Sequence, residues 1–237
     1  MDDLRAVMAE LDAATERMLA TVAKLTDEDL RQPSALPGWT RGHVVAHIAR
    51  NADSCWNLLE WARTGVEVPQ YPNDEVREAG VEASAGRPAA ELLAENEIAA
   101  ARFAAQMHTM PEAAWQATVR ARAGWAHPAS YTIPRRWREV EVHHADLAAG
   151  FSDKDWSEAY IRWELTDTLA ALRSHGGLTV TRVRAIDADI DVRLDGPGPE
   201  ARGSARELLS WLTGRTEAPS WPAPPRWPLP APLGGSS

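Results

Sequence analysis

The segment REVEVHHADL places acidic side chains and imidazoles at a spacing that could serve chemistry. On a helix, residues four apart lie on one face, so Glu139 and His143 would stand one above the other. Glu141 points away from this face and His144 lies one position off it, so both are expected to be bystanders. A carboxylate beside an imidazole is half of a metal site, or alternatively an ordinary solvated pair on a helix surface.

A second histidine pair with the same spacing occurs in GHVVAHIARN, where His43 and His47 are four residues apart. His43 falls in the first turn after Thr40, where exposure to solvent is usual. His47 stands among Val and Ile side chains, so its ring must have a polar partner if it is buried. That partner is a metal ion in one interpretation and a main-chain carbonyl in the other.

Together His47, Glu139 and His143 would provide two imidazoles and one carboxylate. This set is common around catalytic Zn²⁺, whose fourth position stays open, and it also suits other divalent ions such as iron. Asp146 would lie on the same side as Glu139, where it could accept an imidazole N–H, as metal-bound histidines usually require. It could equally be a surface charge. The pattern predicts a metal site if the two helices pack together.

The apolar periodicity predicts four long helices that could provide this packing. They cover residues 2–25, 41–63, 88–107 and 135–150. The second follows the turn LPGWT, in which Thr40 can cap its first turn. A polar loop holding Pro69, Pro72 and Asn73 precedes the third helix, and residues 111–134 stay unassigned. Four long helices imply a bundle.

The pattern changes after Gly150, which predicts a second, small α+β domain over residues 151–216, following the bundle at 1–150. We expect a helix over 156–173, two short strands within 178–194 and a helix over 204–215. The segment GPGPEARG looks too short for a further strand, which predicts a reduced domain. Residues 217–237 form a proline-rich tail, expected to be an extended strap or a disordered end.

Net charge, cysteine count and hydropathy exclude several classes of protein. The chain has 25 basic and 34 acidic residues and a formal charge of −9, which opposes unspecific binding to nucleic acids and anionic membranes. Cys55 is the single cysteine, so neither an internal disulfide nor a cysteine-rich zinc module can form. The N-terminus has acids where a signal peptide needs bases, and no segment is apolar over the length of a bilayer. We therefore expect a cytoplasmic protein.

Four stretches resemble successive blocks of one known family: LPGWTRGHVVAHIARNAD, YPNDEVREAGVEASAGRPAAEL, REVEVHHADLAAG and SARELLSWLTGR. This is the family of mycothiol-dependent maleylpyruvate isomerases, whose N-terminal part belongs to the DinB-like metal-binding helical bundles. The resemblance extends to Arg215 and keeps the blocks in order. It implies a mainly α fold, in which a DinB-like four-helix bundle precedes a small α+β domain.

The resemblance also implies a site and two cofactors. The bundle would hold a divalent metal ion, with Zn²⁺ as the expected ion, through His47, Glu139 and His143, and the second cofactor would be the small thiol mycothiol. The family reaction converts maleylpyruvate to fumarylpyruvate. A thiolate adds to the double bond, the resulting single bond rotates, and elimination leaves the trans product. A metal with an open position would lower the pKa of the thiol.

A dicarboxylate substrate should be bound by cations, and arginine is best suited to a two-pronged carboxylate contact. The resemblance makes Arg215 the first candidate and Arg77 the second, although each could instead be a surface or helix-end cation. Two other functions stay open: a mycothiol S-transferase that conjugates electrophiles, and a non-catalytic, metal-stabilised binding protein. We expect a monomer that binds a small-molecule substrate and a low-molecular-weight thiol.

Overall fold

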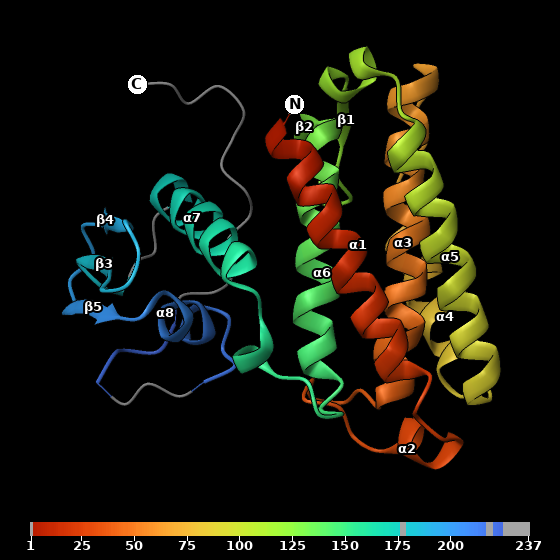
Figure 1. The fold of residues 1–237 in the computed structure, drawn as a ribbon, viewed down its shortest axis with the longest axis horizontal. Coiled ribbons are helices and arrows are strands. Elements are labelled where there is room, and N and C mark those ends of the chain that lie inside the picture. The colour runs from red at the N-terminus through yellow and green to blue at the C-terminus, as the bar shows by residue number, and fades with distance from the viewer. Residues whose placement is uncertain (1, 176–178, 217–219, 225–237) are drawn as a thin grey trace. The chain divides into compact units, whose positions relative to one another are not determined.

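The computed structural model describes residues 2–175, 179–216 and 220–224, and the chain divides into two compact units (Figure 1). The first comprises Met1–Ser152 and the second Asp153–Ser237. Within the described residues, none of the helices combines the length and the apolar character needed to cross a bilayer.

The first unit is a four-helix bundle, as the sequence predicts (Figure 1). Its helices are α1 (Asp2–Val22), α2 (Asp27–Arg31), α3 (Arg41–Thr64), α4 (Asp74–Ala85), α5 (Ala89–Thr109) and α6 (Thr132–Asp146). The four long helices α1, α3, α5 and α6 pack side by side, and the shorter α2 and α4 lie against α3. Helix α3 contacts both α5 and α6. The bundle therefore brings the two helices of the candidate site together.

Apolar side chains at helical spacing build the core of the bundle. The stripe predicted on α1 is buried at Leu11, Ala14, Met18 and Val22. The other helices contribute large buried side chains, among them Leu58, Leu59, Leu92, Phe103, Ile133 and Trp137. Each such side chain stabilises the fold by about 1.5–3 kcal/mol relative to an exposed one.

Helix α3 begins where its sequence predicts. The Thr40 hydroxyl accepts a hydrogen bond from the main-chain N–H of His43, and the His43 ring lies against the Thr40 main chain and hydroxyl in return. Gly65 ends the helix in the left-handed conformation, with φ of 73°, that glycine adopts without strain. His47 therefore lies seven residues, or about two turns, after the cap.

The start of α3 is tied to the end of α6 by one side chain. The guanidinium of Arg41 donates from Nε to the carbonyl of Leu147 at 2.9 Å and from Nη2 to that of Ala148 at 2.7 Å. These carbonyls belong to the residues just after α6, where main-chain acceptors lack partners within the helix. The contact fixes the two helix ends against each other.

Three parts of the bundle differ from the sequence expectation. The polar loop after Pro72 holds helix α4, because Asn73, taken as a loop residue, caps it by accepting from the N–H of Val76 at 2.8 Å. Residues 111–134 contain the antiparallel strands β1 (Thr118–Arg120) and β2 (Ala126–Pro128) with a 3₁₀ turn on either side. Helix α6 is shifted toward the N-terminus, with Pro134 in its first turn, where a missing N–H costs nothing.

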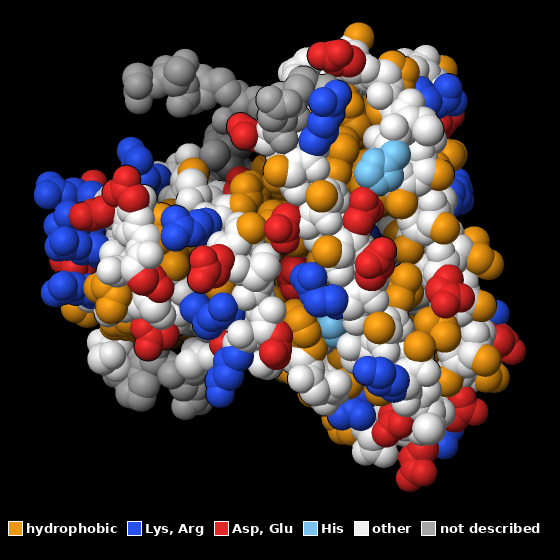
Figure 2. Space-filling view, viewed as in Figure 1, with side chains coloured by type: hydrophobic (Ala, Val, Ile, Leu, Met, Phe, Trp, Pro, Cys, Tyr) orange, Lys and Arg blue, Asp and Glu red, His pale blue; other side chains and the backbone are white. Residues whose placement is uncertain are grey.

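The second unit has the α+β character that the sequence predicts. It contains α7 (Glu158–His175), β3 (Arg182–Ala185), β4 (Asp191–Arg193), β5 (Glu200–Gly203) and α8 (Ala205–Leu212). The expectation of a reduced domain was wrong, because EARG within GPGPEARG forms β5, which pairs parallel with β3. Side chains alternate between exposed and buried along β5, the period of a half-buried strand. In Figure 2, Lys and Arg side chains gather over this small sheet.

Part of the proline-rich tail packs on the second unit. The rings of Trp221 and Trp211 pack edge to face, with their centroids 5.3 Å apart. The indole N–H of Trp211 donates to the carbonyl of Pro222 at 2.9 Å. Residues 217–219 and 225–237, over which the sequence predicts the rest of the tail, lie outside the described residues.

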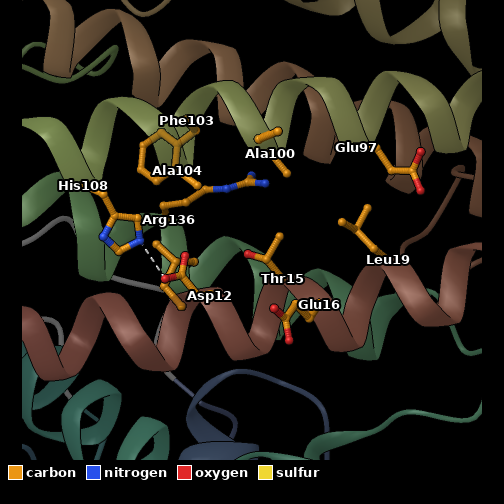
Figure 3. Close-up of a pocket in the computed structure, with 12 residues that line it drawn as sticks. Asp12, Thr15, Glu16, Leu19, Glu97, Ala100, Phe103, Ala104, His108 and Arg136 are labelled. Carbon is orange, nitrogen blue, oxygen red and sulfur yellow. Dashed lines mark hydrogen bonds and ion pairs between the residues drawn. The ribbon is translucent and has the colours of Figure 1, made fainter.

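Arg136 is a buried cation inside the bundle. Its Nη1 donates to the carbonyl of Ile48 at 3.0 Å and to the amide oxygen of Asn51 at 2.8 Å. The side chain of Arg136 also lines a groove between α1 and α5 (Figure 3). The ion pair of Asp12 and His108 forms part of the wall of this groove. Main-chain and amide oxygens, together with this opening, offset part of the cost of burying a guanidinium.

Candidate metal centre

The structure brings His47, Glu139 and His143 together, one from α3 and two from α6. His47 Nε2 lies 3.1 Å from Glu139 Oε2, and His143 Nε2 lies 3.4 Å from the same oxygen. The two imidazole planes are nearly perpendicular, at 89°, with centroids 4.7 Å apart. One donor atom from each side chain therefore points to a common centre, and these atoms all lie within 4.8 Å of one another.

Asp146 orients one of these imidazoles. Its carboxylate accepts from His143 Nδ1 at 2.9 Å, and its own main-chain oxygen accepts from the N–H of Ala35 at 2.8 Å. Asp146 is only 2% exposed, so the alternative interpretation as a surface charge is wrong. Because Nδ1 is engaged by Asp146, Nε2 is the nitrogen that faces the centre.

Arg77, predicted as a substrate-binding cation, lies at the edge of the same cluster. Its Nη2 donates to His47 Nδ1 at 3.4 Å, and its guanidinium lies over the ring of Tyr71, 5.9 Å from the centroid. Since an arginine can only donate, His47 accepts at Nδ1 and donates from Nε2 to Glu139. Trp39 packs edge to face on His47 with centroids 5.6 Å apart. Neither Trp39 nor Tyr71 carried a signal in the sequence that marked it for the site.

Arg215, the first candidate for that role, belongs to the second unit. There its Nη1 donates to the carbonyl of Thr213 at 2.5 Å. Its contact with a substrate stays a prediction from the sequence.

The cluster fixes the charge of each of its members. Burial would raise the pKa of Glu139, but hydrogen bonds from His143 and His47 hold it well below the usual range. Burial lowers the pKa of His47, against the effect of Glu139, which raises it. Burial also acts to lower the pKa of His143, but the carboxylates of Asp146 and Glu139 raise it to about 9. Near neutral pH the cluster is a carboxylate, a neutral imidazole and an imidazolium.

The donor set fits a divalent ion such as Zn²⁺. Nitrogen and carboxylate ligands about 2.0–2.2 Å from a tetrahedral ion are separated from each other by about 3.3–3.5 Å. The separations of 3.1 and 3.4 Å between the imidazole nitrogens and Glu139 Oε2 are close to this spacing. Two nitrogens and one oxygen with an orienting carboxylate behind them are a set that zinc and iron both accept.

Comparison with known proteins adds to this geometry. Residues 11–148 match the model of the family described as mycothiol maleylpyruvate isomerase N-terminal domain. The chain belongs to this family. Crystal structures of the mycothiol-dependent maleylpyruvate isomerase and of one of its histidine-to-alanine mutants match with TM-scores of 0.82 and 0.81. In both cases the identity is 27%, over 94% of this chain and 97% of the other. No curated protein matches the sequence.

The resemblance and the mainly α fold expected from the sequence are thus confirmed. The part of the chain that matches the mycothiol maleylpyruvate isomerase family contains the three candidate ligands and Arg77, whereas Arg215 lies beyond it. The likeness to the solved isomerase also includes the second unit, because it covers 94% of this chain.

Other polar residues near the site serve the packing of the bundle. Glu141, only 1% exposed, accepts from Arg17 Nη2 at 2.7 Å, and the His144 ring lies 2.7 Å from the hydroxyl of Thr21 and stacks on Phe151. These two residues contact α1 instead of the metal centre, in line with their positions off its helix face.

Two further residues, His43 and Cys55, have limited exposure to solvent. His43 is half-buried and not solvent-exposed as expected, because it takes part in the cap of α3 and lies 3.4 Å from Glu82. Cys55 is a buried thiol whose pKa is raised by burial, which makes it a poor nucleophile.

Proposed function

We propose that the protein is a metal- and mycothiol-dependent cis–trans isomerase that converts maleylpyruvate, or a related unsaturated oxo-dicarboxylate, to the trans isomer. The single observation that carries the proposal is the convergence of His47, Glu139 and His143 in a chain of this family. In this reaction a thiolate adds to the activated double bond, the resulting single bond rotates, and elimination restores the double bond in the trans form.

His47 and His143 would hold the metal through Nε2 and Glu139 through its carboxylate, with Zn²⁺ as the proposed ion. A metal with an open position supplies a positive charge that lowers the pKa of a thiol and keeps it as thiolate near neutral pH. Asp146 keeps a proton on His143 Nδ1, so that the lone pair of Nε2 faces the centre. Trp39 packs against the ring of His47 and restricts its rotation.

Arg77 would bind a carboxylate of the substrate. When a metal occupies His47 Nε2, the remaining ring proton is on Nδ1, which then no longer accepts from Arg77. The guanidinium must direct its N–H groups to another acceptor, and a substrate carboxylate offers two parallel oxygens. Arg77 would thereby hold one end of the substrate beside the metal centre. Arg215 stays, from the sequence, a proposed substrate-binding cation.

The proposal is tested by metal analysis and by turnover. The protein as purified should contain one equivalent of a divalent metal, which His143→Ala and His47→Ala should lose. With mycothiol, the wild-type protein should change the absorbance of maleylpyruvate, and mass spectrometry should find a product of unchanged mass. A stable thiol adduct would identify an S-transferase instead. Unchanged metal content in His143→Ala would remove the basis of the proposal.

A further inference from the structure

A hollow of about 310 Å³ opens on the bundle beside the candidate metal centre. It lies between α4 and the turn that precedes α3, and it is lined by Trp39, Arg77, Glu78, Val81 and Glu82. This volume is at the lower end of the range for ligand pockets, which leaves room for one six-membered sugar or inositol ring.

Two side chains of the hollow also touch the metal centre. Trp39 contacts the ring of His47, and Arg77 donates to Nδ1 of the same ring. A molecule seated in the hollow would therefore lie one side chain away from the candidate ligands. Its reactive end could reach the centre while its body stays in the hollow.

The lining shows which chemistry the hollow would accept. Trp39 is half-buried and Val81 is buried, so together they offer an apolar wall. Glu78 and Glu82 are exposed at the mouth, and Glu78 has no hydrogen-bond or ion-pair partner among the described residues. A carboxylate is a strong acceptor for hydroxyl donors, and an indole packs well against the C–H groups of a sugar ring.

The same lining is unfavourable for the proposed substrate. A dicarboxylate entering this hollow would approach two carboxylates, and like charges at short range oppose binding. Arg77 is the one cation of the lining, and it lies at the end next to His47. An uncharged polyol avoids this repulsion and uses both the acceptors and the apolar wall.

We propose that this hollow binds one ring of the hydroxyl-rich body of the thiol, and so directs its sulfur to the centre formed by His47, Glu139 and His143. Mycothiol fits this description, because its cysteine is carried on a neutral sugar–inositol body. The inference rests on the proposed function for the identity of the thiol. It assigns Trp39, Glu78 and Glu82 to thiol binding and leaves Arg77 to the substrate.

The test uses S-methyl mycothiol, which keeps the polyol body and cannot react. Its dissociation constant is measured by titration calorimetry on the metal-loaded wild-type protein, on Glu78→Ala and on the double variant Glu78→Ala/Glu82→Ala. Loss of hydrogen bonds to charged acceptors should weaken binding about tenfold in the double variant. Glu75→Ala, which removes an exposed carboxylate from the first turn of the same helix, is the matched control and should bind like wild type.

Trp39 is tested by a second measurement. Saturation-transfer NMR of S-methyl mycothiol should show the strongest transfer to the ring C–H protons of its body, and Trp39→Ala, compared with wild type at equal metal occupancy, should abolish it. Dissociation constants unchanged in the double variant, or transfer retained in Trp39→Ala, would overturn the inference.

The two proposals can fail separately. If wild-type protein binds S-methyl mycothiol but leaves maleylpyruvate unchanged, the proposed substrate is wrong and the thiol site stands. If it isomerises maleylpyruvate while the variants bind the thiol normally, only the thiol site is wrong. If wild-type protein isomerises maleylpyruvate with mycothiol but does not bind S-methyl mycothiol, the thiol site is wrong and the proposed function stands.

Discussion

Metal binding should displace one proton from the site, and the charges of the cluster indicate its origin. Glu139 is already ionised and His47 is already neutral near pH 7, because their pKa values are both lowered. His143 carries a proton there, since its pKa is raised to about 9 by the flanking carboxylates of Asp146 and Glu139. Replacing Asp146 with Asn keeps the shape of the side chain and removes one of these two charges. The pKa of His143 should then fall.

The magnitude follows from competition between the proton and the metal at His143 Nε2. The protein without metal binds the proton and the loaded protein does not, so apparent metal affinity rises with pH up to the pKa of about 9. One proton corresponds to about tenfold per pH unit, so the gain from pH 7 to pH 9 is about 100-fold, or about 2.7 kcal/mol. In Asp146→Asn the apparent metal affinity should stop rising at a lower pH, because the pKa of His143 is lower in this variant. Its weaker orientation of His143 should cost about 10- to 100-fold in affinity once the proton no longer competes. The two proteins should therefore differ most at pH 9 and least at pH 7.

The assay is calorimetric titration of Zn²⁺ into metal-free protein in buffers of different ionisation enthalpy, which counts the protons released. Proton release from other groups is the same in the wild-type protein and in Asp146→Asn. The difference in their proton counts therefore reports the proton of His143. Wild-type protein should release more protons at pH 7 than Asp146→Asn. Equal proton counts, or an affinity independent of pH in the wild type, would refute the assigned charges.

Three further outcomes are expected. Burial lowers the pKa of His127 from 6.5 to about 4, and the ring of His127 accepts a hydrogen bond from Arg135. Between pH 4 and 6.5 the unfolded chain therefore binds more protons than the folded protein. Stability to urea should fall as pH decreases from 6.5 to 4, by up to about 3 kcal/mol, and an equal fall in His127→Gln would contradict this. Gly42→Ala should lower stability by about 1–3 kcal/mol in thermal unfolding, because the new Cβ would lie 2.2 Å from the carbonyl oxygen of Ala85; wild-type stability would show that α4 moves freely. Arg215→Lys keeps the charge but loses the planar fork, so the KM for the dicarboxylate should rise about tenfold while that for the thiol changes little; an equal rise in both would argue against substrate contact.

The convergence of the three candidate ligands could be predicted in part, because part of its geometry is local. The four-residue step from Glu139 to His143 fixes their common face on any helix, and the cap at Thr40 fixes the start of the helix that carries His47. Apolar neighbours then favoured His47 over His43. These signals need only the helix period and the chemistry of helix ends.

The surroundings of the site could not be predicted in the same way. Trp39 lies in a turn and Tyr71 in a loop, and which groups they meet depends on how α4 packs on α3. Helix α4 itself was missed, because Asn73 is as common in loops as at helix caps and only the bond to Val76 N–H decides between them. Strand β5 was missed since it pairs with β3 across a long connection, which leaves little trace in local sequence.

The hydrogen bonds from Arg41 to the carbonyls after α6 have a consequence for removing and exchanging the metal ion. It holds the helix of His47 against that of Glu139 and His143 through contacts that include no metal. In many small zinc domains the ligands are ordered only by the ion, so that removing it unfolds the chain. In this bundle the ordering of the ligands is already supplied by the fold. A chelator should therefore yield a folded protein, into which zinc, iron or a spectroscopic substitute such as cobalt can be exchanged and compared on one scaffold.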